Sequence, residues 1–239
     1  MNPLDGQVAV VTGASSGIGR AIALALAERG ARLCMVGRDL DALRAVELAT
    51  ANPQAGHRCL RADLALDRDV DDLAAELARD LPRVDALVHA AGVLHWGDFV
   101  TGTPEQFDEQ YRTNLRSPYV LSQKLLPPLK SAKGQIVFVN SSAGLSARAN
   151  VGAYAATKHG LKAVADSLRE EVNAAGVRVL GLYVGRTATR MQAGLHAIEG
   201  RGYDPQSLIQ PEDVATLTVQ ALSLPRTVEV TGITLRPMR

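Results

Sequence analysis

The fold is decided by the stretch Gln7-Val8-Ala9-Val10-Val11-Thr12-Gly13-Ala14-Ser15-Ser16-Gly17-Ile18-Gly19. Its first half is a short apolar run that predicts a buried strand over 7–12, and an apolar helix is expected to follow the glycines near 17–29. Backbone N–H groups and the dipole at the start of such a helix favour an anion, and glycines let a pyrophosphate approach the backbone closely. The spacing is GxxxGxG rather than the more common GxGxxG. The prediction of a dinucleotide site therefore depends on the placement of the glycines between a strand and a helix as well as on their spacing.

Short β-rich runs alternate with helical stretches along the whole chain. The other predicted strands are 32–36, 57–61, 84–89, 134–140, 177–183 and 228–234. The other predicted helices lie near 39–50, 67–79, 104–130, 152–175 and 211–223. Strands that alternate with helices imply right-handed crossovers and a parallel sheet, and strands that are apolar without alternation are typical of a sheet covered on both faces. We therefore expect one doubly wound α/β domain over 1–239 with about seven parallel strands and helices on both faces.

Two helix starts and one long connection can also be read from the chain. Asp39 is a plausible N-cap of the second helix, and Thr103-Pro104 fits the cap and first turn of the fourth. The segment 187–210 is irregular and long, as binding loops and lids often are. Its Met191, Leu195 and Tyr203 are candidates to face a substrate, and a helical excursion packed on the body is an equal alternative.

Composition excludes several classes of function. The chain has 239 residues, 26 basic and 25 acidic side chains and a formal charge of +1, which argues against nucleic-acid and membrane-surface binding. No run of 18 apolar residues predicts a membrane span, and the first residues lack a basic and apolar leader. Cys34 and Cys59 fall inside predicted strands and read as reduced thiols of a cytoplasmic protein, and no Cys/His cluster has the spacing of metal ligands.

A second motif carries the chemistry. Tyr154 and Lys158 are four residues apart, which puts both on one face of the predicted helix. An ammonium beside a phenol favours the phenolate, so we expect Lys158 to lower the pKa of Tyr154 toward neutrality, where it can give or take a proton. Thirteen residues before Tyr154, a strand ends at Ser141, whose hydroxyl could hold a carbonyl or alcohol oxygen; Ser142 is the rival serine. Together these residues predict proton transfer to oxygen.

These residues together resemble the short-chain dehydrogenase/reductase family over most of the chain. The motifs that carry the resemblance are the turn from Thr12 to Gly19, Asp63-Leu64, the run His89-Ala90-Ala91-Gly92, the set Asn114, Ser141, Tyr154 and Lys158, and Gly185-Arg186-Thr187. Within the family the catalytic serine precedes a glycine by three residues, as Ser141 precedes Gly144. Two positions depart from the family pattern: His89 replaces an asparagine, and Val184 stands where proline is usual, which could loosen the turn.

The resemblance implies a Rossmann sheet in the order 3-2-1-4-5-6-7 and a set of site residues. The catalytic residues would be Asn114, Ser141, Tyr154 and Lys158, with Asn114 supporting a water that links Lys158 to solvent. The cofactor-binding residues would be Gly13, Ser15, Ser16, Gly17, Ile18, Gly19, Arg38, Asp63, Leu64, Ala90, Ala91, Gly92, Tyr154, Lys158, Gly185 and Thr187. Within this set Thr187 would hold the nicotinamide carboxamide, and Lys158 would bind the nicotinamide ribose.

The end of the second strand bears on the choice of cofactor. Gly37 occupies the position where NAD-preferring relatives carry an aspartate, and Arg38 follows it. An acidic residue there would bind the ribose 2′-hydroxyl of NAD, whereas an arginine accommodates the 2′-phosphate of NADP. Asp39 is the competing acidic residue, and a role as helix cap fits it better. We therefore expect NADP(H).

The expected function is hydride transfer between NADP(H) and a carbonyl or secondary alcohol, with Tyr154 as general acid and base. Two alternatives stay open: a non-catalytic NADP(H)-binding module that senses redox state, and a 3-oxoacyl-carrier-protein reductase. The small-molecule substrate is not identified; its pocket would be lined by the loops 93–97, 143–151 and 187–203. His95 and Trp96 could border it, although a packed loop tip is the simpler reading. The resemblance also implies a homodimer or homotetramer paired through the helices near 104–130 and 152–175.

Overall fold

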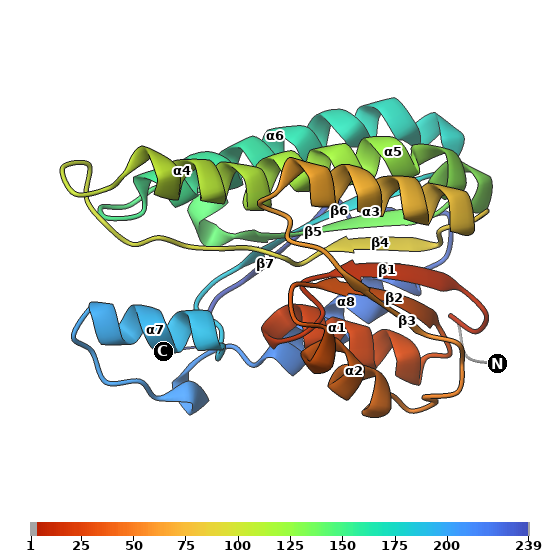
Figure 1. Cartoon of the computed structure of the whole chain (residues 1–239), viewed down its shortest axis with the longest axis horizontal. Coiled ribbons are helices and arrows are strands. Elements are labelled where there is room, and N and C mark those ends of the chain that lie inside the picture. Colours follow the sequence, from red (N-terminus) through yellow and green to blue (C-terminus); the bar gives the residue numbers. More distant parts are fainter. Residues whose placement is uncertain (1–3, 239) are drawn as a thin grey trace.

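The computed structural model describes residues 4–238, and its centre is one parallel sheet (Figure 1). The strands are β1 (Val8–Thr12), β2 (Arg32–Gly37), β3 (Arg58–Arg61), β4 (Ala86–His89), β5 (Gln135–Ser141), β6 (Arg178–Val184) and β7 (Gly232–Leu235). They pair in the order β3-β2-β1-β4-β5-β6-β7, and every pairing is parallel. Strands β1, β4 and β6 are buried along their whole length, as their mainly apolar sequences predict. The predicted fold class and strand order are confirmed.

Helices cover both faces of the sheet, and each face has its own apolar core (Figure 1). On one face lie α1 (Gly17–Glu28), α2 (Leu40–Leu48) and α8 (Pro211–Leu222). On the other lie α3 (Asp67–Asp80), α4 (Pro104–Tyr111), α5 (Ser117–Ala132) and α6 (Gly152–Val172). Ile22 of α1 and Val214 of α8 belong to the first core, and Leu125 of α5 and Leu161 of α6 belong to the second. None of the helices within residues 4–238 combines the length and apolar character that a membrane crossing requires.

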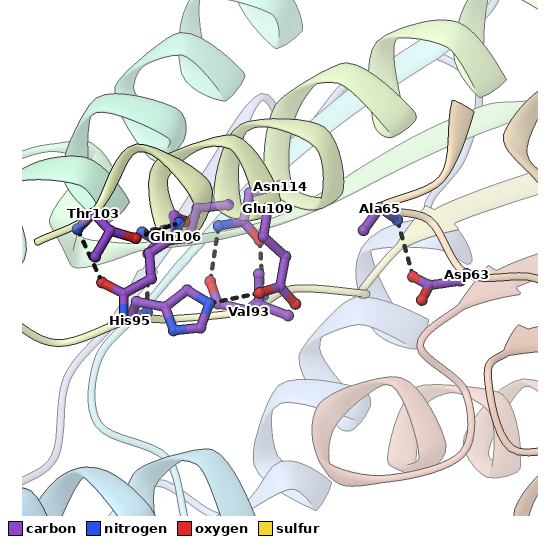
Figure 2. Close-up of polar contacts among 9 residues, drawn as sticks. Asp63, Ala65, Val93, His95, Thr103, Gln106, Glu109 and Asn114 are labelled. Carbon is purple, nitrogen blue, oxygen red and sulfur yellow. Dashed lines mark hydrogen bonds and ion pairs between the residues drawn. The ribbon is translucent and has the colours of Figure 1, made fainter. Parts of the chain in front are cut away.

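Both predicted helix caps are present. The Asp39 carboxylate accepts a hydrogen bond from the N–H of Ala42, which satisfies one of the free donors at the start of α2. Thr103 and Gln106 form a reciprocal capping box at the start of α4, with Pro104 as the first helical residue (Figure 2).

Two predicted elements differ from the structure. The helix expected over 104–130 is interrupted by a π-helical turn, Arg112–Arg116, that separates α4 from α5. The last strand begins at Gly232 rather than 228, because the preceding residues are held by side chains: Arg178 donates to the Val228 carbonyl, and the Glu229 carboxylate accepts from the Val179 N–H.

The long connection over 187–210 is partly helical, which agrees with the second of the two alternatives. Segment 187–210 contains α7 (Arg190–Ile198) and a short 3₁₀ turn (Pro205–Ser207). Thr189 caps α7 by accepting a hydrogen bond from the Gln192 N–H. Figure 1 shows that the chain leaves the C-terminal end of β6 and leads to α7, which lies beyond that end of the sheet and below the loop that precedes α4. The helix therefore lies at the edge of the sheet where the predicted site residues gather.

Candidate active site

Two adjoining clefts open at the carboxyl ends of the strands. The first contains most of the predicted cofactor residues: Gly13, Ser15, Ser16, Gly17, Ile18, Gly19, Arg38, Asp63, Leu64, Ala90, Ala91 and Gly92. The second contains Ser141, Tyr154, Lys158, Gly185 and Thr187. Residues Ile18, Ala90, Ala91, Gly92, Thr189 and Met191 line both clefts. The structure therefore brings the two predicted groups of residues next to each other.

The glycine turn leaves bare backbone on the floor of the first cleft. Gly13 and Gly17 have φ angles of 66° and 53°, which are unfavourable for other residues. A Cβ on Gly13 would lie 2.7 Å from the Cα of Ala91, and one on Gly19 would lie 2.2 Å from the carbonyl oxygen of Gly13. Gly19 is thus required for the close packing of the turn itself, in addition to the approach of a ligand.

The first turn of α1 fits a phosphate group. Its N-cap residue, Ser16, has extended backbone and its side chain makes no capping hydrogen bond, so it satisfies none of the free N–H groups there. Such groups at a glycine-rich turn are suited to bind the pyrophosphate of a dinucleotide. The residues present in this cleft therefore fit that group.

The sequence motif did not reveal the role of Thr12, the residue just before the turn. Its hydroxyl accepts hydrogen bonds from the N–H groups of Ala90 and Ala91, at 3.2 and 3.3 Å, and donates to the Val88 carbonyl at 3.4 Å. This side chain joins the ends of β1 and β4, which form two sides of the cleft. Its position in the quoted turn was the only sequence signal. Ala62 and Thr113 also line this cleft and were missed by sequence reasoning, whereas Gly37, Val93, Thr189 and Arg190 lie at positions or in loops that the sequence had already pointed to.

The residues expected to meet the adenosine end lie at the rim. Arg38 is exposed, and its carbonyl oxygen accepts a hydrogen bond from Arg61. Asp39 also lies on this side, but its carboxylate caps α2, as expected. Asp63 accepts from the Ala65 N–H at 3.0 Å, so its side chain is held at the end of β3 (Figure 2). The basic group at this rim is therefore free to contact a ligand, while the neighbouring acid is engaged.

In the second cleft the side chains predicted to take part in proton transfer are almost enclosed. Ser141 ends β5, and Tyr154 and Lys158 lie on α6 with exposed fractions of 9% and 4%. Gly185 and Thr187 follow β6, and the Thr187 hydroxyl donates to the Gly185 carbonyl. Val184, which replaces the usual proline, is buried at the end of β6 and lines the same cleft. A carbonyl group entering this cleft would meet Ser141 and Tyr154 together.

The expected electrostatics of the pair are wrong in direction for this structure. Burial raises the pKa of Tyr154 above its usual value, and a hydrogen bond with Ser141 partly opposes that rise. Lys158 is one helical turn away, but its ammonium donates to the Val139 carbonyl at 3.0 Å rather than to the phenol. Burial also lowers the pKa of Lys158 to about 8. Desolvation therefore outweighs the attraction between ammonium and phenolate that the spacing suggested.

Asn114 lies beneath the clefts and lines neither of them. It sits within the π-helical turn and is fully buried. Its amide exchanges two hydrogen bonds with the backbone of Val93, each 2.9 Å long (Figure 2). It donates a third to Thr157, the neighbour of Lys158. Asn114 therefore connects the loop after β4 to α6. Its expected support of a water molecule stays a prediction.

Some of the residues that flank the predicted site line the second cleft, and others contact residues outside it. Trp96, Met191 and Leu195 line the second cleft, whereas Tyr203 packs edge-on against His196 instead. His95 turns away and pairs with Glu109 at 2.7 Å (Figure 2). The rival serine, Ser142, also lines the cleft.

His89, the other departure from the family pattern, is part of the protein interior. Its ring stacks on Phe138 at 5.0 Å, and Nε2 lies 2.9 Å from the Ser122 hydroxyl. Burial lowers the pKa of His89 to about 3, so the ring is neutral at cellular pH. Within residues 4–238 no group of three or more His, Cys, Asp or Glu side chains could hold a metal ion.

Comparisons with known proteins agree with this geometry. The family model for short chain dehydrogenases matches residues 7–199. An uncharacterized short-chain type dehydrogenase/reductase, y4eK of Sinorhizobium fredii, is 35% identical and aligns over 99% of this chain and 94% of its own length. Glycine betaine reductase ATRR of Emericella nidulans is 32% identical over 98% of this chain, which spans only 19% of that much longer protein.

Solved structures give the same result. A metagenomic short-chain oxidoreductase crystallised with NADP superposes with a TM-score of 0.84, is 32% identical and is covered over 99% of both chains. Other similar structures were solved with NADP or NADPH. Since the family model spans most of the sequence and relatives align from end to end, the chain belongs to the short-chain dehydrogenase/reductase family.

Proposed function

We propose that this protein transfers a hydride between NADP(H) and a carbonyl compound or secondary alcohol. The observation that carries the proposal is the shared wall of the two clefts: Ala90, Ala91 and Gly92 border both the glycine cradle and the cleft of Tyr154. A dinucleotide with its pyrophosphate on the turn could therefore extend toward the enclosed proton donor. The cofactor, when bound, supplies the hydride chemistry, and the protein supplies orientation and proton transfer.

The preference for NADP(H) rests on the rim of the cofactor cleft. Arg38 offers a planar guanidinium that can bind a 2′-phosphate through paired hydrogen bonds. Gly37 presents no carboxylate to a 2′-hydroxyl, and Asp39 is engaged as a cap. NADP or NADPH in similar solved structures supports the same choice.

The chain's own residues divide the work around the reacting oxygen. Ser141 orients the carbonyl or alcohol oxygen by hydrogen bonding, and Tyr154 donates a proton to it during reduction and accepts one during oxidation. Lys158, which donates to the Val139 carbonyl, would turn to bind the cofactor ribose. Thr187 would hold the nicotinamide carboxamide, and the burial of Tyr154 and Lys158 would exclude water from the proton transfer.

The burial of Tyr154 and Lys158 also weighs against the redox-sensing module. Burying an ammonium costs free energy, as the lowered pKa of Lys158 shows, and a sensor would need only the glycine turn. Reduction of the 3-oxo group of an acyl chain carried by acyl-carrier protein is the same ketone chemistry, so such a substrate becomes one test among others.

Turnover of NADPH with a panel of aldehydes and ketones tests the proposal. We expect NADPH consumption with at least one carbonyl compound, and a loss of about a hundredfold or more in kcat for Tyr154→Phe, which removes only the hydroxyl. The control for folding is the binding of NADPH to the variant, which is measured by the fluorescence of the bound NADPH. A Tyr154→Phe enzyme with near-normal turnover would refute the mechanism, and NADPH binding without turnover on any substrate would favour the sensor.

We also propose a cytoplasmic homodimer or homotetramer. Phe107 and Tyr111 of α4 and Tyr119 of α5 leave 44%, 41% and 51% of their surfaces exposed on the helices expected to pair. The two thiols are free, as expected in a reducing compartment. Sedimentation of the purified protein would reveal the state of assembly.

A further inference from the structure

We propose that the substrate carries an anionic group, a carboxylate or a phosphate, at the end of an apolar body, and that Arg148 binds that group. The inference rests on the proposed function, because it concerns the lining of the cleft in which Tyr154 would act. It identifies the chemical class of the substrate and one residue that selects it.

The lining of the cleft combines a polar reaction site with several apolar side chains. Tyr154 and Lys158 are buried, and together with Ser141 they would meet the reacting carbonyl. Apolar side chains provide another part of the lining: Leu94, Trp96, Ala149, Val151, Met191 and Leu195. Such a wall favours an aliphatic or aromatic body next to the carbonyl.

Arg148 interrupts this wall from the exposed loop between β5 and α6. Its guanidinium has no hydrogen bond or ion pair with any of residues 4–238, whereas Arg186, the other arginine of the cleft, donates two hydrogen bonds to the Glu199 carboxylate, at 2.6 and 2.8 Å. An arginine presents several donors and stays charged, so an uncommitted one beside a ligand cleft is suited to bind a carboxylate or phosphate.

A second hollow adjoins the cleft and extends the positive charge. It is lined by Trp96, Arg148, Ala149, Asn150, Arg186, Ile198, Glu199 and Arg201, and it shares Trp96, Arg148, Ala149 and Arg186 with the cleft. Three arginines and one glutamate give this lining a formal charge of +2. Glu199 is already paired with Arg186 and lies 3.7 Å from Arg201. The positive charge is therefore not compensated within the hollow, and an anion gains from entering it.

The anionic group would take no part in the reaction. During reduction the carbonyl carbon gains a hydride and its oxygen gains the proton of Tyr154, so that C=O becomes CH–OH while NADPH becomes NADP⁺. The carboxylate or phosphate leaves the site unchanged. Its contact with Arg148 contributes binding and orientation only.

Matched substrates provide the test. We would compare kcat/KM for 4-formylbenzoate and 4-formylphenyl phosphate with that for neutral methyl 4-formylbenzoate, using NADPH and the full chain. The measured quantity is the ratio of each anion to the ester, and we expect Arg148→Gln to lower it about tenfold, the effect of losing one charge-assisted contact at a partly exposed site. Arg148→Lys should keep most of the ratio, and Arg68→Gln, on the exposed surface of α3, should leave it unchanged. Whichever anion shows the larger drop identifies the preferred group; an unchanged ratio for both in Arg148→Gln would overturn the proposal.

A binding measurement separates this inference from the proposed reaction. Trp96 is the single tryptophan of the chain and lines both hollows, so its fluorescence can report occupancy directly. We would titrate the protein with unreactive 4-methylbenzoate and its methyl ester. Tighter binding of the carboxylate that Arg148→Gln removes would support the anion site even if no turnover were found. Equal affinities of the carboxylate and the ester for the wild-type protein would overturn it even in an active enzyme.

Discussion

The Nζ atom of Lys158 lies 5.8 Å from the centre of the Tyr154 ring and donates its hydrogen bond to the Val139 carbonyl, 3.0 Å away. The two side chains share a helix face, yet Lys158 does not hydrogen-bond the phenol. Because both are buried, each is displaced toward its neutral form: the pKa of Tyr154 is raised and that of Lys158 is lowered to about 8. Tyr154 is thus protonated at neutral pH, as its proposed role as the acid in reduction requires.

Ser141 should set the pH at which alcohol oxidation begins. Oxidation requires deprotonated Tyr154, and the hydrogen bond with Ser141 lowers a pKa that burial has raised. Ser141→Ala should therefore move the onset of oxidation to higher pH, in addition to reducing turnover through lost orientation of the substrate. A pH profile of kcat would reveal the shift. Ser142→Ala, which alters the neighbouring serine of the same cleft, should not move it; a shift with Ser142→Ala alone would exchange the roles of the two serines.

Lys158 should make stability depend on pH. Its pKa is about 8 in the folded chain against an ordinary 10.5, so between these values the unfolded chain binds a proton that the folded chain has lost, and stability rises with pH. Below pH 8 Lys158 is protonated in both the folded and the unfolded chain, so the folded state carries the full free-energy cost of the buried ammonium. This cost is about 3 kcal/mol, at about 1.4 kcal/mol per pKa unit. Lys158→Met should accordingly gain stability relative to wild type at pH 7, and the gain should shrink toward pH 10.

Urea unfolding of wild type and variant across this pH range would measure the difference. Taking the difference between the two proteins cancels the thiols, since burial raises the pKa of Cys34 and of Cys59, the latter to about 11, in both proteins. Replacing Lys130, on the surface of α5, by methionine provides the control. A stability difference between wild type and Lys158→Met that stays constant with pH would contradict the lowered pKa.

Gly19→Ala should abolish dinucleotide binding. The added Cβ would lie 2.2 Å from the Gly13 carbonyl oxygen, so the turn must shift, and overpacking of this kind costs about 1–3 kcal/mol. Calorimetry with NADPH and a thermal melt would measure both effects. Gly194→Ala is the matched control, because a Cβ there meets no atom within 4 Å and alanine favours the helix α7. Wild-type affinity in Gly19→Ala would mean that the phosphates bind elsewhere.

Arg38 should determine the choice between the two dinucleotides. A charge-assisted phosphate contact contributes about 1.5–3 kcal/mol, so NADPH should bind about ten- to a hundredfold more tightly than NADH. Arg38→Gln should remove most of this preference and Arg38→Asp should narrow or invert it. Fluorescence titration with both cofactors provides the measurement, with Arg44→Gln, an exposed arginine on α2, as control. Equal affinities in the wild-type protein would exclude the assignment.

Much of the fold could be predicted because local and global signals agree. The apolar runs of β1 and β4 are buried on both faces, and the Asp39 and Thr103 caps begin helices where the periodicity places them. The start of β7 could not be predicted, since the chain before Gly232 is held by Arg178 and Glu229, whose partners are distant in sequence.

The structure places most of the predicted site residues around the two clefts, but the electrostatics of the site could not be predicted. Spacing placed Tyr154 and Lys158 on one face, and the structure brings Ser141 to them. The direction of the Tyr154 pKa depends on how completely the ring is enclosed, which no spacing reports. The hydrogen bonds of Thr12 were hidden for a similar reason, because they connect strands that are 76 or more residues apart in the chain.

The π-helical turn at Arg112–Arg116 has a consequence for insertions and deletions. A π-turn accommodates one residue more than an α-helical turn, and each residue of an α-helix advances the side chains by about 100° around its axis. The extra residue therefore determines how the side chains of α5 are rotated about the helix axis relative to those of α4, and Asn114 lies within the turn that contains it. Deleting one residue within this turn would rotate α5 relative to α4 and separate Asn114 from Val93 and Thr157, although no residue of either cleft wall except Thr113 lies in the deleted region.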